Sequence, residues 1–423
     1  MRDAVTSWGS GLMQDLSQGD WRQVLPLGFA GLLVWGLWLY RFVLSRRAKP
    51  VYNDFRATTS VVVPSYREDP EILLRGLRTW LDQGPDEVII VPDVGDIEVI
   101  EALSRVGDAR LRVLPISHEG KRPALCHGIR HAQHDILVLS DSDTFWRRGL
   151  LAAVQMPFVD PAVGGVSTQQ NVYDRRSSIW RRVADWLVNL RYHDYVPAMG
   201  AAGAVACISG RTAAYRRSAV MPVLDNLEHE YFLGRRCNSG DDGRLTWLVL
   251  ASGYRTVHQS SAKALSMFPD SLRAFTKQRV RWSRNSYRTY LTAAWKGWLW
   301  RVPLVTKVTV LQILLTPLTM ALAVGYLLFS RLDFSQGVGR GIGVAAGWLL
   351  LGRGVRGAAH LRRHPQELLL LPVVALVVVF IALPVKMYAF FTMNKQGWLT
   401  RDSQHLGGEA QAASTLSPEP AAF

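Results

Sequence analysis

The chain has 423 residues, of which 48% are hydrophobic and 20% are charged, and its formal net charge is +15. This composition excludes a disordered chain, and the length suits about two to four structural units around a large core. Thirty-five glycines without a three-residue period exclude a collagen-like fibre, and three cysteines without CxxC spacing exclude a disulfide scaffold or a zinc ribbon.

The first predicted element is an apolar segment over residues 25–45, which is long enough to cross a bilayer and carries one charge near its end. A cleaved signal peptide is the alternative, but the preceding residues are slightly acidic and no small-residue cleavage site follows. Arg46, Arg47 and Lys49 come directly afterwards. The positive-inside rule therefore predicts a transmembrane helix preceded by an extracytoplasmic segment, residues 1–24.

Residues 51–265 lack a spanning segment and alternate between strand and helix patterns. Continuous apolar runs predict strands, and amphipathic stretches predict helices at 71–83 and 120–133; the strands lie at 60–64, 87–93, 111–116 and 135–143. This alternation predicts an α/β fold with a mostly parallel, doubly wound sheet covered on both faces. The absence of GxGxxG and GxxxxGK[ST] motifs argues against a dinucleotide-binding fold and a P-loop ATPase.

Two regions after these strands predict helices lying in the membrane interface. Residues 179–199 place apolar and charged side chains on opposite sides at helical spacing, and residues 266–300 contain a similar stretch followed by a tryptophan-rich segment. Ordinary surface helices of a soluble domain are the alternative. The tryptophans near these segments favour the membrane interface.

Residues 303–393 predict a C-terminal transmembrane region of about three segments. Residues 303–329 and 368–393 are continuously apolar, whereas 341–359 is interrupted by Arg353 and Arg356. These arginines either line a polar path or extend to the membrane surface. The side of the C-terminus stays open, and residues 394–423 predict a GWLTR segment followed by a disordered tail. Membrane-surface charge explains part of the excess of basic residues, so a nucleic-acid partner is not expected.

Three short motifs can support chemistry. Asp141 and Asp143 follow a strand and can hold a hard divalent cation, although a solvated turn has the same pattern. Asp241 and Asp242 precede an apolar helix, where they suit either a helix cap or a general base. The segment Gln278–Trp282 combines guanidinium, amide and aromatic groups suited to a diphosphate and a sugar ring.

The motifs PSYRED, an Asp after the second strand, GKRPAL, DSD, SGR, YRR, GDDGRLT and QRVRW occur in this order. As a set they resemble the processive membrane glycosyltransferases of family 2, nearest to hyaluronan synthases and nodulation-type chitooligosaccharide synthases, with chitin and cellulose synthases more distant. The resemblance runs from about residue 60 to 401, including the ending LPVKMYAFFTMNKQGWLTR.

The resemblance implies a GT-A catalytic domain over 51–265, facing the cytoplasm, in a multi-pass protein of the plasma membrane. It implies Mg²⁺ or Mn²⁺ as cofactor. The implied partners are a UDP-sugar donor (UDP-GlcNAc, and UDP-GlcA if the product is hyaluronan), a growing polysaccharide acceptor and membrane lipids. Residues 258–263 resemble a mobile loop that closes over the nucleotide.

The resemblance also implies residue roles. Asp242 would be the general base, and Asp141 and Asp143 would hold the metal. The nucleotide sugar would contact Tyr66, Glu68, Asp93, Lys121, Arg122, Asp141, Lys263, Gln278 and Arg281. The acceptor would contact Cys207, Ser209, Gly210, Asp241 and Trp282.

The chain departs from the family pattern at two places. The SGP acceptor motif reads Ser209-Gly210-Arg211, and the WGTR ending of hyaluronan synthases reads Trp398-Leu399-Thr400-Arg401. The expected activity is an inverting, processive β-glycosyl transfer that builds and exports a GlcNAc-containing polymer. The alternatives are a non-processive family 2 enzyme acting on a lipid or short acceptor, and an inactive membrane transport or scaffold protein.

Overall fold

Eight strands form one sheet in the order β3-β2-β1-β4-β7-β6-β10-β5. Neighbouring strands run parallel except where β7 pairs with β4 and β6 and where β5 pairs with β10. The strands are β1 (Thr59–Pro64), β2 (Glu87–Val91), β3 (Leu111–Val113), β4 (Ile136–Ser140), β5 (Thr144–Trp146), β6 (Val163–Val172), β7 (Thr212–Arg216) and β10 (Arg255–Ser266). The predicted mostly parallel α/β sheet is confirmed.

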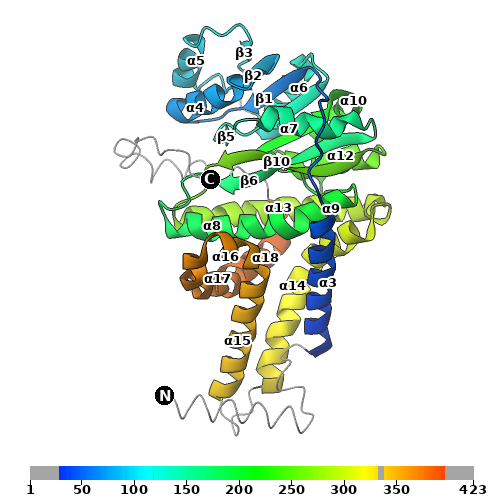
Figure 1. Cartoon of the computed structure of the whole chain (residues 1–423), viewed down its shortest axis with the longest axis vertical. Helices are drawn as coiled ribbons and strands as arrows, with labels where there is room; N and C mark the ends of the chain where they lie inside the picture. The colour runs from blue at the N-terminus through cyan, green and yellow to red at the C-terminus, as the bar shows by residue number, and fades with distance from the viewer. Residues whose placement is uncertain (1–27, 118, 332–337, 396–423) are drawn as a thin grey trace.

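The structure, a computed structural model, describes residues 28–117, 119–331 and 338–395. The predictions for the N-terminal segment 1–24 and for the GWLTR segment lie outside the described residues, as does the prediction for the tail from residue 396. Figure 1 shows the sheet and its covering helices at one end of the molecule, with α3 (Gly28–Arg47), α14 (Leu304–Arg331) and α15 (Val338–Arg356) extending away from it.

Both faces of the sheet are buried because the side chains of its strands alternate between two cores. Val61 and Val63 of β1 pack in one core with Leu77 of α4 (Pro70–Leu81). Val62 packs in the other core with Leu125 of α6 (Lys121–His131). The first core also includes α5 (Ile97–Ser104) and α7 (Leu150–Gln155), and the second includes α12 (Asp241–Ala251).

A layer of helical segments lies between the sheet and the extended helices. These are α8 (Ile179–Leu190), the π-helical turn η2 (Arg191–Tyr195), α9 (Val196–Ala201) and α13 (Leu272–Trp295), followed by the short η4 (Trp298–Trp300). The hydroxyls of Ser178 and Ser271 cap α8 and α13 by accepting hydrogen bonds from the backbone amides three residues later. The two predicted amphipathic segments are therefore helical, and α8 and α13 run across the base of the sheet (Figure 1).

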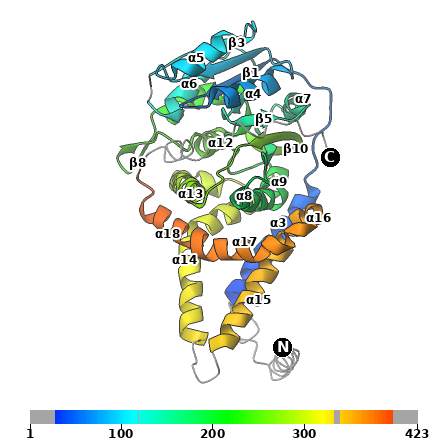
Figure 2. The same ribbon diagram turned by 90° about the vertical axis from the view of Figure 1, so that its left-hand side faces the viewer.

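Among the described residues, Leu304–Leu322 and Pro365–Phe391 are long and apolar enough to cross a membrane. The second stretch comprises η5 (Pro365–Leu370), α17 (Leu371–Val377), the π-helical η6 (Val378–Ala382) and α18 (Leu383–Phe391), and follows α16 (Ala358–Arg363). Figure 2 shows α17 and α18 running beneath α8 and α13, crosswise to α14 and α15. The predicted spanning segment 368–393 therefore lies across α14 and α15 instead of alongside them, and it also crosses α8 and α13, which Figure 2 shows end-on.

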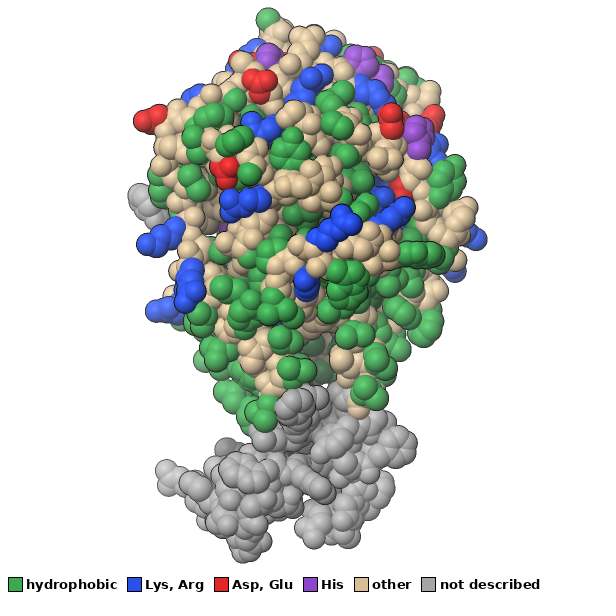
Figure 3. All heavy atoms as spheres, turned by 90° about the vertical axis from the view of Figure 1, so that its right-hand side faces the viewer, with side chains coloured by type: hydrophobic (Ala, Val, Ile, Leu, Met, Phe, Trp, Pro, Cys, Tyr) green, Lys and Arg blue, Asp and Glu red, His purple; other side chains and the backbone are tan. Residues whose placement is uncertain are grey.

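The surface changes character along the molecule. In Figure 3, hydrophobic side chains gather over the half that carries the extended helices, whereas charged side chains are frequent over the sheet. Leu322 of α14 and Leu39 of α3 are 63% and 54% exposed, respectively. Such an apolar zone is typical of a surface that contacts lipid or another protein.

Candidate active site

Two adjoining pockets open at the carboxyl ends of β1, β2 and β4, and both are lined by Pro64 and Lys121. One pocket contains predicted metal, base and acceptor residues: Asp141, Gly210, Asp241 and Asp242. The other contains predicted nucleotide residues, Tyr66 and Asp93, together with Ser117 and Glu119. Seven of the predicted site residues thus line one continuous region at the strand ends, where ligands bind in such sheets.

The Asp-Ser-Asp turn lies between β4 and β5 and is held by the backbone on both sides. The amide of Asp141 donates to the carbonyl of Arg211 at 3.4 Å, and the carbonyl of Asp143 accepts from the amide of Met267 at 3.2 Å. The Ser142 hydroxyl donates to the carboxylate of Glu68. This hydrogen bond holds Glu68 against the turn, and Glu68 lines neither pocket. Asp141 and Asp143 carry the carboxylate oxygens that a hard divalent cation prefers.

Asp241 and Asp242 are the first two residues of α12, where the helix dipole favours negative charge. Gly240 precedes them with φ of +77°, and a side chain at this position would lie 3.0 Å from Asn285 of α13. Glycine is therefore suited to the left-handed turn that brings both acids to the pocket. The Asp242 carboxylate accepts a hydrogen bond from the amide of Gly243 at 2.7 Å.

Lys121 links the two acidic motifs. It is the first residue of α6, and its Nζ lies 2.7 Å from Oδ1 of Asp141 and 3.1 Å from Oδ2 of Asp241. A Cβ on Gly210 would approach this Nζ to 3.2 Å. The small residue of the SGR motif therefore leaves space beside the ammonium group, within reach of an incoming anion.

The pocket perturbs its acids in opposite directions. Burial, reinforced by the neighbouring Asp241, raises the pKa of Asp242, and Lys121 offsets only part of this effect. Burial also opposes ionisation of Asp141, but the ion pair with Lys121 outweighs it and lowers the pKa of that carboxyl. A carboxyl with a raised pKa beside one kept ionised is the pattern expected of a proton acceptor next to a charge-binding group.

The QxxRW motif lies on α13, beneath the pocket and toward the extended helices. The Arg281 guanidinium contributes to lowering the pKa of Asp141. Trp282 forms an edge-to-face contact with Phe268, at 6.1 Å between ring centroids, and Arg211 lies over both rings at 4.7 and 4.0 Å. Gln278 is buried, and its Oε1 accepts no hydrogen bond from the described residues.

Five predicted nucleotide-binding residues do not line the pockets: Glu68, Arg122, Lys263, Gln278 and Arg281. The guanidinium of Arg122 is turned inward, 2.6 Å from the Glu230 carboxylate, and donates to the carbonyl of Gly240 at 3.1 Å. It therefore supports the loop before Asp241. Lys263 is exposed on β10, a strand that includes residues 258–263, which sequence analysis predicted as a mobile loop.

Cys207 and Ser209 lie close to the acceptor side of the pocket. Burial raises the pKa of the Cys207 thiol to about 12, so the thiol stays protonated. The Cys207 carbonyl accepts from Arg191 at 2.9 Å, and Ser209 forms a hydrogen bond with Tyr192.

Sequence reasoning missed Arg191 and Tyr192 as neighbours of this site, and Tyr215 as a lining residue. Arg191 and Tyr192 come from the π-helical turn η2, which interrupts an otherwise regular amphipathic pattern. Tyr215 comes from a short strand, β7, in which its hydroxyl pairs with Thr246 of α12 at 3.0 Å. Hydrophobic periodicity predicts neither the π-helical turn nor the short strand. The only sequence feature that could have indicated the turn is its run of polar and aromatic residues, Arg-Tyr-His-Asp-Tyr.

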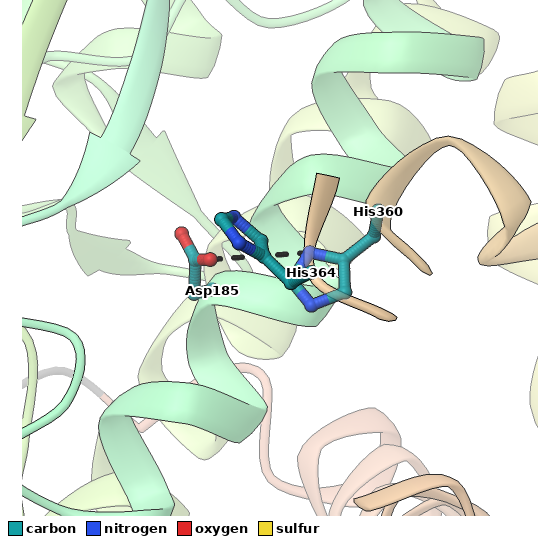
Figure 4. A group of neighbouring side chains, drawn as sticks. All are labelled: Asp185, His360 and His364. Carbon is teal, nitrogen blue, oxygen red and sulfur yellow. Dashed lines mark ion pairs between the residues drawn. The ribbon is translucent and has the colours of Figure 1, made fainter. Parts of the chain in front are cut away.

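A second polar cluster joins α8 to the segment after α15 (Figure 4). Figure 4 shows Asp185, His360 and His364 pointing toward one another, with ligand-type atoms within 4.8 Å. The Arg175 guanidinium lies 3.0 Å from Nδ1 of His364 and 2.6 Å from Glu367, which also accepts from His360 at 2.6 Å. Arg175 is thus the cation that these groups surround, and the cluster connects the two parts as an ion-pair network.

Comparison with known proteins places these features in context. Residues 56–285 match the family described as "Glycosyltransferase like family 2". An N-acetylglucosaminyltransferase of Sinorhizobium fredii is 30% identical over 380 residues, covering 86% of this chain and 88% of the relative. A hyaluronan synthase of Streptococcus pyogenes is 27% identical over 368 residues, covering 84% and 85%.

Among solved structures, a mannosyltransferase from Pyrobaculum calidifontis, in complex with GDP-Man and Mn²⁺, is similar with a TM-score of 0.59 and 21% identity. The similarity covers 84% of this chain and 98% of the mannosyltransferase. At this level of identity the comparison establishes the shared GT-A fold.

Proposed function

The chain belongs to the family 2 glycosyltransferases, and we propose that it is a membrane-embedded, inverting enzyme that elongates a GlcNAc-containing polysaccharide from UDP-sugars. The observation that carries this proposal is the convergence of Asp141, Asp241 and Asp242 around Lys121, next to the pocket of Tyr66 and Asp93. The N-acetylglucosaminyltransferase and hyaluronan synthase relatives support the donor class.

The two pockets divide the donor between them. In this proposal Tyr66 and Asp93 contact the uracil and ribose, with Glu68 holding the Asp-Ser-Asp turn in register behind them. Lys121, at the junction of the pockets, is positioned for the diphosphate. Asp141 and Asp143 would hold Mg²⁺ or Mn²⁺, which neutralises charge on the diphosphate when bound.

The transfer is a single displacement. The acceptor hydroxyl loses its proton to Asp242 as its oxygen attacks C1 of the donor sugar, and the bond from C1 to the diphosphate oxygen breaks with its electron pair leaving on UDP. Attack from the face opposite UDP converts an α-linked donor into a β-glycoside. One general base suffices for this inversion, and the cationic Lys121 and Arg281 stabilise the charge that develops on the leaving group.

The position of α13 supports elongation at the membrane. Trp282 places an aromatic ring beside the guanidinium groups of Arg211 and Arg279, at 4.7 and 4.9 Å. Its helix, α13, lies between the sheet and the extended helices (Figure 2). We propose a multi-pass protein of the plasma membrane with the pocket in the cytoplasm, in which the growing chain leaves between the helices. A family 2 enzyme that adds one residue to a lipid or short acceptor is the second candidate.

Product length and donor requirement test the proposal together. The purified full chain in lipid is given UDP-GlcNAc and UDP-GlcA singly and in pairs, with Mg²⁺ or Mn²⁺, while UDP release and product size are measured. Turnover with UDP-GlcNAc alone yields a chitin-like polymer, and a requirement for both donors yields hyaluronan. Products extended by a single residue would contradict processive elongation.

A further inference from the structure

Three arginines meet where the extended helices approach η2. Arg41 of α3 is 1% exposed, donates to Oε1 of Gln312 in α14 at 2.7 Å, and lies 4.7 Å from the ring centre of Tyr195. Arg353 and Arg356 are one helical turn apart on α15, and both interact electrostatically with Tyr195.

One carboxylate, that of Asp194, is close enough to interact electrostatically with Arg41 and Arg356, but it forms no direct ion pair with them. Among the described residues, none of the three forms an ion pair within 4 Å, and the Nε atoms of Arg41, Arg353 and Arg356 are buried without a hydrogen-bond partner. The nearby acid is Asp194 of η2, which accepts from Nε1 of Trp38 at 3.3 Å and whose pKa is raised by burial. Three guanidinium groups beside one carboxylate leave an excess of positive charge in a largely buried place, so the cluster favours an anionic ligand.

The surroundings indicate where such a ligand comes from. Leu39 of α3 and Leu351 of α15 are 54% and 53% exposed, on the apolar zone that we propose faces lipid. The Arg356 guanidinium stacks on Trp35 at 5.1 Å, an arrangement common where side chains meet headgroups. Arg353 and Arg356 lie at the end of α15 and Arg41 lies against Tyr195 of η2, so the cluster is at the end of this zone nearest the interface helices. In the membrane embedding proposed above, this end lies at the depth of lipid phosphates.

We propose that Arg41, Arg353 and Arg356 form a binding site for the phosphodiester headgroup of an anionic membrane lipid. Guanidinium groups match phosphate oxygens with paired, charge-assisted hydrogen bonds, whereas zwitterionic headgroups bring their own cation into the site. The proposal rests on the membrane embedding proposed above and is independent of donor and product identity.

A lipid in this site would brace η2. That turn carries Asp194 and Tyr195 toward the arginines and Arg191 toward the Cys207 carbonyl on the acceptor side of the active site. The site therefore connects the membrane surface with the acceptor side through five consecutive residues, Arg191–Tyr195.

The test is lipid retention by the purified full chain. Detergent-solubilised protein is titrated with phosphatidylglycerol or phosphatidylcholine, and bound lipid is counted by native mass spectrometry. We expect phosphatidylglycerol to bind about tenfold more tightly, as two charge-assisted hydrogen bonds allow. The R353Q/R356Q variant should lose this preference, whereas R47Q/R362Q, which removes two exposed arginines outside the cluster, should keep it.

Two further experiments distinguish a lipid headgroup from free phosphate and exclude misfolding of the variants. R353K/R356K retains the charges and should retain part of the preference, with elution in size-exclusion chromatography matching the wild type. Equal retention of both lipids by the wild type, or an unchanged preference in R353Q/R356Q, would overturn the proposal. Displacement of phosphatidylglycerol by equimolar inorganic phosphate would assign the cluster to free phosphate and also overturn it. Glycosyl transfer is not part of this readout, so its absence bears only on the proposed function.

Discussion

At the residue scale, Asp242 combines position and protonation in a way that suits a base. It lines the pocket at the start of α12, next to Asp241, and burial raises its pKa. Its carboxylate still accepts a hydrogen bond from the Gly243 amide, which fixes its orientation without neutralising it. The residue is therefore held at the surface of the site where an acceptor hydroxyl would arrive.

Asp242→Asn should lower the transfer rate by roughly 10²- to 10⁴-fold, because the amide cannot accept a proton yet keeps the shape of the side chain. UDP binding, measured by calorimetry with the same protein, should stay within about twofold of wild type, since the nucleotide pocket is lined by other residues. Wild-type product yield from this variant would exclude Asp242 as the base.

The raised pKa of Asp242 also predicts the acid limb of the pH profile. Only the ionised carboxylate acts as a base, so kcat should fall as pH decreases through the raised pKa, at a higher pH than an ordinary aspartate would give. Steady-state rates of UDP release from pH 4 to 9 measure this. A rate that stays constant down to the usual aspartate range would contradict the assignment.

Lys121 sets the charge balance of the same pocket. Lys121→Met removes the ammonium group that stabilises ionised Asp242, so the pKa of Asp242 should rise further and the acid limb of kcat should move to higher pH. Donor KM should increase because a cation at the diphosphate is lost. Lys121→Arg retains the charge and serves as the matched control; an identical acid limb in Lys121→Met and wild type would refute this role.

At the element scale, the catalytic part is joined to the C-terminal helices by the network around Glu367. This carboxylate pairs with Arg175 at 2.6 Å and Arg182 at 3.3 Å, and accepts from His360. Arg175 lies in the loop before α8, Arg182 in α8 and His360 in α16, so the Glu367 side chain connects the α8 region with the C-terminal segment of α16 and η5. Trp186 of α8 packs against His360 at 4.8 Å between ring centroids and closes the network from one side.

Glu367→Gln should destabilise the protein by about 2 kcal/mol, because it removes the counter-charge of two partly buried guanidinium groups, those of Arg175 and Arg182. Thermal unfolding in detergent followed by circular dichroism measures the shift in Tm. Glu101→Gln, which breaks an exposed pair with Arg105, should change Tm little. Equal shifts in the two variants would show that the Glu367 network adds no stability beyond a surface pair.

At the scale of the whole molecule, α8 and α13 lie between the sheet and the extended helices (Figure 1). The sheet, with the candidate pockets at its strand ends, lies on one side of α8 and α13. Helices α17 and α18 lie on the other side (Figure 2). The apolar stretch Pro365–Phe391 has the length of a span, yet α17 and α18 lie crosswise both to α14 and α15 and to α8 and α13, which Figure 2 shows end-on. Its prolines and the π-helical η6 interrupt regular hydrogen bonding, which allows a bent path beneath the catalytic part.

Local sequence patterns predicted the first half of the sheet and most of the pocket. The strands β1, β2 and β4 are buried on both faces, so they read as continuous apolar runs, and acids at their ends meet wherever a parallel sheet forms. The order of DSD, GDD and QxxRW then identified the family. The apolar strands, the acids at their ends and the family motifs each depend on a short stretch of chain, so they can be predicted from the sequence without coordinates.

Tertiary structure alone decided the rest. The strand β6 carries buried polar residues such as Gln170, and it pairs with residues 258, 259 and 263 of β10 around a register shift, so this pairing joins backbone segments that are distant in sequence. The same holds for Arg122, whose charge is turned to buried Glu230 instead of the nucleotide pocket. A motif specifies which groups are present, whereas the direction of a long flexible side chain depends on the charges that folding brings beside it.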